Sequence, residues 1–186
     1  MNPQESAAAP EVSVAEDPIK VQNARVLALL TRLFGEATFT NVEEPYGLLT
    51  VTTTRERIHD IIAGLQQDKE IKLNFLTTMC GINYPENEGQ ELGMIYHLHS
   101  LTQNIRLRIK IFFPIADPVV PTLTDLYATA NWMEREAYDF FGIIFTGHPN
   151  LIRILNVEDM DYHPMRREYP LEDGTREDKT DLFFGR

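Results

Sequence analysis

The chain has 186 residues, of which 43% are hydrophobic, enough for one substantial core but not for two full domains. Its 17 Lys and Arg against 28 Asp and Glu give a net charge of -11, which disfavours nucleic acid and anionic lipid as partners and favours a basic surface. The single cysteine, Cys80, excludes an intrachain disulfide and a cysteine-ligated iron-sulfur cluster, and we expect it to be a small buried side chain.

Residues 1–16 are acidic, rich in small residues and interrupted by proline, a composition typical of a disordered leader. The amino terminus has neither the hydrophobic core of a signal peptide nor the arginines of a transit peptide. The chain also has no apolar run of about 18 residues that would span a bilayer. We therefore expect any contact with a membrane to be indirect.

The first predicted helix begins at Asp17 and Pro18, because aspartate caps helices and proline suits the first helical position. Apolar residues recur along one face of this helix, and Gly35 ends it. Two short strands are predicted next, at residues 38–41 and 48–53, with a turn between them.

A second helix is predicted after Thr53, which with Glu56 has the spacing of a capping box. Four aliphatic side chains then fall at the i, i+3, i+4 and i+7 positions of a buried helical face: Ile58, Ile61, Ile62 and Leu65.

Residues 71–79 and 94–101 look extended, and residues 105–113 form the clearest predicted strand. In this last strand aliphatic residues alternate with a basic face, which is either solvated or binds a partner; its members are Arg106, Arg108 and Lys110. Together these elements predict an α+β fold in residues 17–155, with a mixed, largely antiparallel sheet and helices packed on it.

The segment from Asn131 to Leu155 has the most demanding pattern. Asn131 and Glu134 have the spacing of a second capping box, Gly142 follows two phenylalanines as a left-handed helix end, and Gly147-His148-Pro149 predicts a further turn.

Residues 156–186 mix acids, arginines and spaced aromatics, which predicts an extended tail that binds a partner. Arg166 and Arg167 either make bidentate salt bridges to partner carboxylates or remain in solvent.

Candidate catalytic chemistry is sparse. Glu136, Asp139 and His148 suggest a metal-dependent hydrolase, and His97 and His99 project to one side of a strand, but neither set has the spacing of a zinc motif. The sequence also lacks a nucleophile elbow, a dinucleotide fingerprint and a phosphate-binding loop.

Several blocks occur in a specific order between about Met94 and Arg186: Tyr96-His97-Leu98, Arg106-Leu107-Arg108, Pro121-Thr122-Leu123-Thr124-Asp125, the Asn131 to Leu155 segment, and His163-Pro164-Met165-Arg166-Arg167-Glu168-Tyr169-Pro170-Leu171. This order resembles the C subunit of respiratory complex I, the NADH:quinone oxidoreductase, which is known as the 30 kDa subunit family. The chain departs from the family pattern at Arg167, where lysine is usual, and at Glu168, where aspartate is usual.

The resemblance implies a scaffold subunit of the peripheral arm, with no catalytic residue, metal or cofactor of its own. It would support electron transfer from NADH to quinone coupled to proton translocation, while other subunits hold FMN and the iron-sulfur clusters. The implied partners are other complex I subunits, chiefly the D subunit, which helps form the quinone pocket, and the B subunit, which holds the terminal cluster. The implied location is the cytoplasmic side of a bacterial inner membrane.

By the same resemblance, the structural or partner-interface candidates are Glu134, Arg135, Glu136, Asp139, Gly142, Gly147, His148, Pro149, Arg153, His163, Pro164, Arg166, Arg167, Tyr169 and Pro170. The main alternative is the equivalent scaffold subunit of a membrane-bound hydrogenase or formate hydrogenlyase complex.

Overall fold

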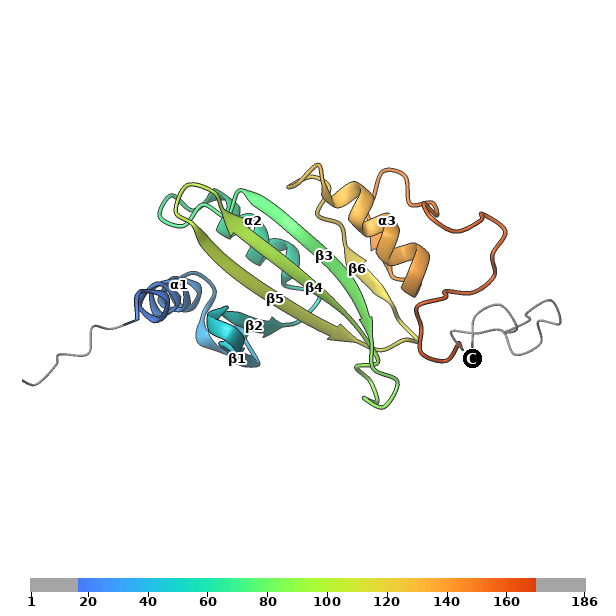
Figure 1. The fold of residues 1–186 in the computed structure, drawn as a ribbon, viewed down its shortest axis with the longest axis horizontal. Helices are drawn as coiled ribbons and strands as arrows, with labels where there is room; N and C mark the ends of the chain where they lie inside the picture. The colour runs from blue at the N-terminus through green and yellow to red at the C-terminus, as the bar shows by residue number, and fades with distance from the viewer. Residues whose placement is uncertain (1–16, 170–186) are drawn as a thin grey trace, which may run out of the picture.

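The computed structural model describes residues 17–169 and is built on a five-stranded sheet (Figure 1). Its strand order is β1 (Asn41–Glu43), β2 (Thr50–Thr53), β5 (Ile105–Phe113), β4 (Leu92–Ser100) and β3 (Phe75–Asn83). Only the β2–β5 pair is parallel within this sheet; the other pairs are antiparallel. The predicted α+β fold with a mixed, largely antiparallel sheet is confirmed.

Helix α1 (Pro18–Phe34) begins and ends as predicted. The Asp17 carboxylate accepts a hydrogen bond from the Ile19 amide at 3.0 Å, and Gly35, at φ 82°, follows the last helical residue. Two short 3-10 turns then lead into the sheet, η1 (Glu36–Thr38) and η2 (Pro45–Gly47). The first turn takes the start of the strand predicted at residues 38–41, so β1 begins only at Asn41, and the second turn joins β1 to β2.

Helix α2 (Ile58–Gln67) lies behind the sheet in Figure 1 and buries the predicted aliphatic face completely. Its predicted capping box is wrong. The Thr53 hydroxyl donates instead to the Thr38 carbonyl at 2.9 Å, and the helix begins five residues after Thr53, without a side-chain cap. Pairing of β2 in the sheet holds Thr53 away from the helix end.

The sheet has one buried face and one open face. The aliphatic residues of β5 are buried as predicted, and they pack with β4 residues such as Met94 and Tyr96 against the aliphatic side chains of α2. On the opposite face, the alternate residues of β5 and those of β4 from Ile95 to His99 are half-buried or exposed. No helix in the described part of the chain lies over this face of β4 and β5 (Figure 1).

The third strand differs from its prediction at both ends, starting at Phe75 rather than at residue 71. The Asp68 carboxylate accepts from the Glu70 and Ile71 amides, and this turn buries Ile71 outside the sheet. Cys80 is exposed, contrary to its predicted burial. The alternation of the strand turns its neighbours, not its own side chain, toward the core.

Helix α3 (Ala130–Phe141) runs beside the edge strand β3, with the Phe141 ring against Gly81, where a Cβ atom would clash. A small parallel pair, β6 (Val119–Pro121) and β7 (Ile144–Thr146), brackets this helix in the sequence. Residues 150–169, here called the strap, then pass alongside α3 without helix or strand (Figure 1). No helix among residues 17–169 is long and apolar enough to cross a bilayer.

Replacement of Gly142 by Ala should destabilise the protein more than replacement of Gly89. Both glycines have positive φ, 73° and 77°, so both variants carry left-handed strain of about 1 kcal/mol. At Gly142 an added Cβ would also lie 2.5 Å from the Arg166 guanidinium and 2.6 Å from the His163 ring, whereas nothing lies within 4 Å at Gly89. Urea unfolding should therefore show an extra loss of about 1 to 3 kcal/mol for Gly142→Ala. Equal losses in the two variants would show that the strap does not rest on this glycine.

Candidate functional site

Helix α3 carries two carboxylates, Glu134 and Asp139, that are both fully buried. Buried carboxylates are rare and need compensating donors. Each one reaches a different chain segment, Glu134 the residues before α3 and Asp139 the strap that follows it. The two acids therefore tie the helix to both of its flanks.

Asp139 anchors the start of the strap. One carboxylate oxygen, Oδ2, accepts from the consecutive backbone amides of Ile154, Leu155 and Asn156 at 3.1, 2.8 and 2.9 Å. The other, Oδ1, accepts from Arg153 at 2.7 Å and from the Asn156 amide side chain at 3.0 Å. The carboxylate replaces the backbone partners that a helix or sheet would otherwise supply to these amides.

Burial alone would raise the pKa of Asp139, but the donors from Asn156, Leu155 and Arg153 outweigh it and hold the pKa well below its ordinary range. Asp139 is therefore ionised at neutral pH. Arg153, whose side chain is 9% exposed, supplies the paired positive charge. Such a buried pair is costly to break, because removing one partner leaves the other charge uncompensated.

Arg153 extends the anchor along the strap. Its guanidinium donates to the Asp139 carboxylate and carbonyl at one end and to the Met160 and Tyr162 carbonyls, at 2.7 and 2.9 Å, at the other. His163 adds a second link, since its Nδ1 lies 3.0 Å from the Asp139 carbonyl. A carbonyl oxygen only accepts, so Nδ1 carries the proton. The strap is thus held at both its beginning and its middle.

The last turn of α3 holds the next part of the strap. Gly142 adopts the predicted left-handed conformation, and the Arg166 Nε donates to the neighbouring Phe141 carbonyl at 2.8 Å. The Arg166 side chain is only 17% exposed. Within the chain, Arg166 thus satisfies a carbonyl group that the helix end leaves open.

Glu134 does not cap α3, so the predicted capping box with Asn131 is wrong. The helix begins at Ala130, which puts Asn131 inside the first turn. The Glu134 carboxyl instead contacts the Thr122 hydroxyl at 2.6 Å and the Leu123 amide at 2.7 Å. Burial raises the pKa of Glu134 from 4.5 to about 7, although both hydrogen bonds oppose the rise.

The predicted turn at Gly147-His148-Pro149 is held by the imidazole of His148. Its Nδ1 accepts from the Asn150 amide at 3.0 Å, and its Nε2 lies 3.1 Å from the Asn131 carbonyl. Both ring nitrogens are therefore occupied. Glu136 lines a small hollow with Cys80, and residues 17–169 contain no cluster of three or more potential metal ligands.

The outer side of the strap differs from its anchored side. The Arg135 side chain holds the strap from within, by donating to the Ile152 and Arg153 carbonyls at 3.1 Å each. The Arg167 side chain is 60% exposed, with its guanidinium 6.0 Å from the centre of the Tyr84 ring. Exposed apolar side chains occur along the same segment: Ile152, Leu155, Val157, Tyr162, Met165 and Tyr169. Pro164 lies between His163 and Met165, while Pro170 falls outside the described residues.

Sequence reasoning missed the partners that give the candidate residues their roles. Thr122 belongs to one of the ordered sequence blocks, whereas Asn83 and Asn156 belong to no predicted motif. Asn83 accepts from the Arg167 amide at 2.9 Å, across 84 residues of sequence. An isolated asparagine has no local signal for such a contact.

Replacement of Asp139 by Asn should lower the free energy of unfolding by about 3 kcal/mol or more. The substitution leaves Arg153 without its charge partner, and it places the new amide NH2 group against N–H groups that donate to Asp139 in the native protein. The exposed Asp161→Asn, which makes the same charge change, is the control. Chemical denaturation at neutral pH should separate the two variants. As pH falls toward the low pKa of Asp139, the native protein should lose the same stabilisation. A variant as stable as the control would contradict the anchoring role.

Replacement of Glu134 by Gln should change how stability depends on pH. The native pKa of Glu134, about 7, lies above its ordinary value of 4.5, so between these values the unfolded chain binds fewer protons than the folded one. Stability should therefore fall as pH rises from 4.5 to 7, by an amount of the order of 3 kcal/mol, and Gln should abolish this fall. The control is Glu136→Gln, an exposed acid on the same helix. If the unfolding stability of the native protein and of Glu134→Gln changed in parallel with pH, Glu134 would not have the raised pKa that its burial predicts.

The chain matches known proteins over most of the sheet and the site. A family model described as the respiratory-chain NADH dehydrogenase 30 Kd subunit matches residues 51–175. The C subunit of the NADH-quinone oxidoreductase of Nocardioides sp. is 42% identical over 67% of this chain and 50% of its own length. That of Mycolicibacterium smegmatis is 42% identical over 66% of this chain and 52% of its own. The chain thus spans about half the length of these relatives.

Solved structures agree with the sequence match. A trypsin-resistant fragment of Nqo5 is 31% identical, with a TM-score of 0.56 over 70% of this chain and 99% of the fragment. A chain of the membrane-bound sulfane sulfur reductase, an archaeal respiratory membrane complex, has a TM-score of 0.67 at 17% identity, which shows a shared fold. The family match covers the buried acids of α3 and the described strap, and the chain belongs to the respiratory-chain NADH dehydrogenase 30 Kd subunit family.

Proposed function

We propose that this chain is a scaffold subunit of the peripheral arm of an NADH:quinone oxidoreductase. It supports electron transfer from NADH to quinone, coupled to proton translocation, without contributing catalytic residues. FMN, the iron-sulfur clusters and the binding sites of NADH and quinone belong to other subunits. The chain acts from the cytoplasmic side of the membrane and contacts chiefly the D subunit, which helps form the quinone pocket, and the B subunit, which holds the terminal cluster.

The observation that carries the proposal is the anchored strap. Asp139 and Arg153 order a segment without regular secondary structure, and this segment exposes apolar and aromatic side chains. Exposed apolar side chains and an arginine are typical of protein interfaces. A strap already held in position loses less conformational entropy on binding than a free tail would. Residues 156–186 are therefore proposed as the partner-binding segment, with the described part ordered before the partner arrives.

A second candidate is the equivalent scaffold of a membrane-bound hydrogenase or formate hydrogenlyase complex. A chain of the membrane-bound sulfane sulfur reductase, an archaeal respiratory membrane complex, shares this fold, so the fold alone does not select the first candidate. The sequence relatives, which are named as C subunits of NADH-quinone oxidoreductase, favour the first candidate.

Mass spectrometry of the proteins that co-purify with the tagged chain from its native membranes, after extraction in mild detergent, tests both. We expect flavin and iron-sulfur subunits together with a quinone-pocket subunit. A nickel-iron hydrogenase set would support the second candidate, and a chain recovered alone would exclude both.

Substitution of the two neighbouring arginines of the strap should have different effects, one on folding and the other on assembly. Arg166→Ala should lower the melting temperature, because the open carbonyl of Phe141 loses its donor. Arg167→Ala should leave the melting temperature unchanged, because its side chain is 60% exposed and its amide contact with Asn83 is retained. It should nevertheless reduce recovery of the chain in the membrane complex. Arg25→Ala on the exposed side of α1 is the control. Normal incorporation of Arg167→Ala would remove this side chain from the interface.

A further inference from the structure

The open face of the sheet carries a row of basic side chains that the strap does not use. We define the basic face as Arg106, Arg108 and Lys110 of β5 together with His97 and His99 of β4. In the antiparallel register His99 lies opposite Arg106, and His97 lies opposite Arg108. Each histidine thus faces an arginine across the strand pair, with no acid between them. Such pairs give little stability by themselves, because they bring no opposite charges together.

One of these pairs is satisfied within the chain. The Arg108 Nε donates to the His97 Nε2 at 2.7 Å, so this nitrogen is unprotonated. Burial, and then the charge of Arg108, lower the pKa of His97. His97 therefore neutralises none of the positive charge of Arg108. Lys110 has a weak ion pair with Glu43 at 3.8 Å.

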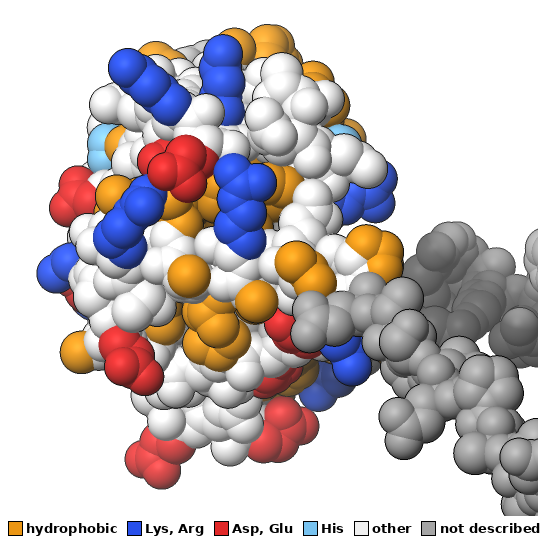
Figure 2. Space-filling model, turned by 90° about the vertical axis from the view of Figure 1, so that its left-hand side faces the viewer, with side chains coloured by type: hydrophobic (Ala, Val, Ile, Leu, Met, Phe, Trp, Pro, Cys, Tyr) orange, Lys and Arg blue, Asp and Glu red, His pale blue; other side chains and the backbone are white. Residues whose placement is uncertain are grey.

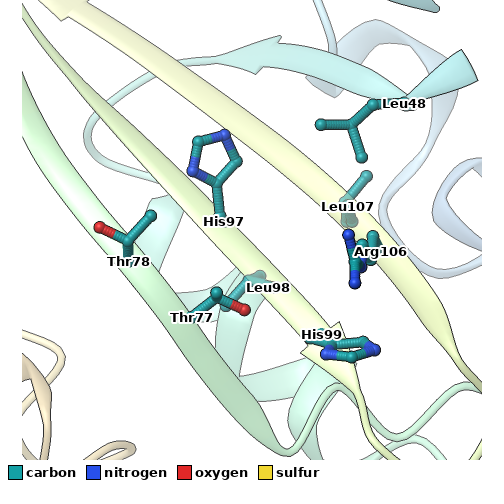
Figure 3. A pocket seen from close by; sticks show the side chains of 8 residues that line it. All are labelled: Leu48, Thr77, Thr78, His97, Leu98, His99, Arg106 and Leu107. Atoms are coloured by element: carbon teal, nitrogen blue, oxygen red, sulfur yellow. The ribbon is translucent and has the colours of Figure 1, made fainter. Parts of the chain in front are cut away.

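The other pair borders a hollow of about 220 Å³, shown in Figure 3. His99 and His97 project from β4 between Thr77 and Thr78 of β3 and Arg106 of β5. The His99 Nε2 is buried with no hydrogen-bond partner in the described chain. The Arg106 side chain is exposed at the rim of this hollow and has no hydrogen bond or ion pair with another residue among residues 17–169.

A second hollow of about 330 Å³ shares Leu48 and Arg106 with the first and continues toward Ile19 at the start of α1. Neither hollow is lined by an Asp or Glu, although the chain has a net charge of -11. Figure 2, which views the molecule from the end that carries α1, shows several basic side chains beside apolar ones on this end, with acidic side chains among them. The two hollows thus adjoin at Leu48 and Arg106, and their lining residues are polar, basic or apolar but not acidic.

We propose that the basic face binds an acidic, extended segment of another subunit. One carboxylate of this segment enters the hollow and accepts hydrogen bonds from His99 and Arg106, and a second carboxylate meets Arg108 and Lys110. The spacing supports an extended peptide rather than a small anion. Alternate residues of β5 are about 7 Å apart, which is also the spacing of alternate side chains in an extended partner. Charge-assisted bonds of arginine to carboxylate give such contacts strength and register.

This inference rests on the proposed function in one respect, namely that the partner is a subunit of the same complex. It assigns a surface on the opposite side of the sheet from α2, distinct from the strap. The strap contributes exposed apolar side chains, whereas the basic face contributes charge. The two surfaces can therefore be tested separately.

The first test places a photo-crosslinking amino acid at Thr78, an exposed residue at the rim of the hollow, in the intact complex purified from membranes. Mass spectrometry should map the crosslink to a segment of another subunit that contains at least two Asp or Glu residues. A crosslink to residues 1–16 of this chain, which contain Glu5, Glu11 and Glu16 and no Lys or Arg, would overturn the proposal. A crosslink to a second copy, or none in an assembled complex, would do the same.

The second test reverses charge. Arg106→Glu should reduce recovery of the full chain in the complex about tenfold or more, because a like charge would then face the incoming carboxylate. The control, Arg25→Glu, makes the same charge change on an exposed site of α1. Both purified chains should keep the native melting temperature. Replacing the crosslinked partner acid by Lys should restore recovery of Arg106→Glu.

The outcomes separate the two proposals. Equal recovery of Arg106→Glu and Arg25→Glu in an otherwise normal complex would overturn the basic face alone. A native chain that enters no respiratory complex would overturn the proposed function and this inference with it.

Discussion

The buried ion pair of Asp139 and Arg153 is the interaction on which the rest of the site depends. The strap has no helix or strand to satisfy its backbone, so its amides and carbonyls need other partners. Asp139 accepts from consecutive amides at one end, and Arg153 donates to the carbonyls of Met160 and Tyr162 further along. Because the charges are buried, the desolvation cost is recovered only when all of these bonds form together. The strap is therefore ordered as a unit.

The anchor fits the proposed scaffold role, because it holds a segment without regular secondary structure in one position. Electron transfer requires fixed distances between centres, and a scaffold provides them through rigid surfaces. The strap presents apolar side chains on one side of the domain, while the basic face of the sheet presents charge on another. Apolar burial supplies most of the binding free energy of an interface, and charge selects the partner and its register. The two surfaces are thus complementary in their physical roles.

Sequence reasoning succeeded where the controlling interactions are local. The cap at Asp17, the aliphatic face of α2, the alternation in β5 and the left-handed Gly142 all depend on residues within a few positions of one another. It failed where a distant partner competes with a local one. Thr53 and Glu134 have the spacing of capping residues, but pairing of β2 and the Thr122 segment take them away from the helix ends. The exposure of Cys80 depends on which alternate residues of β3 face the core, and the sequence of this strand does not specify that choice.

The sequence by itself determined the α+β class, the strand and helix patterns and the order of blocks that marks the family, because periodicity and block order are properties of the chain alone. Only the tertiary structure decided the roles of the buried acids, the inward position of Arg166 and the pairing of histidines with arginines on the open face. These features join residues that are 7 to 25 positions apart in the chain, so their energies depend on burial and geometry that exist only after folding.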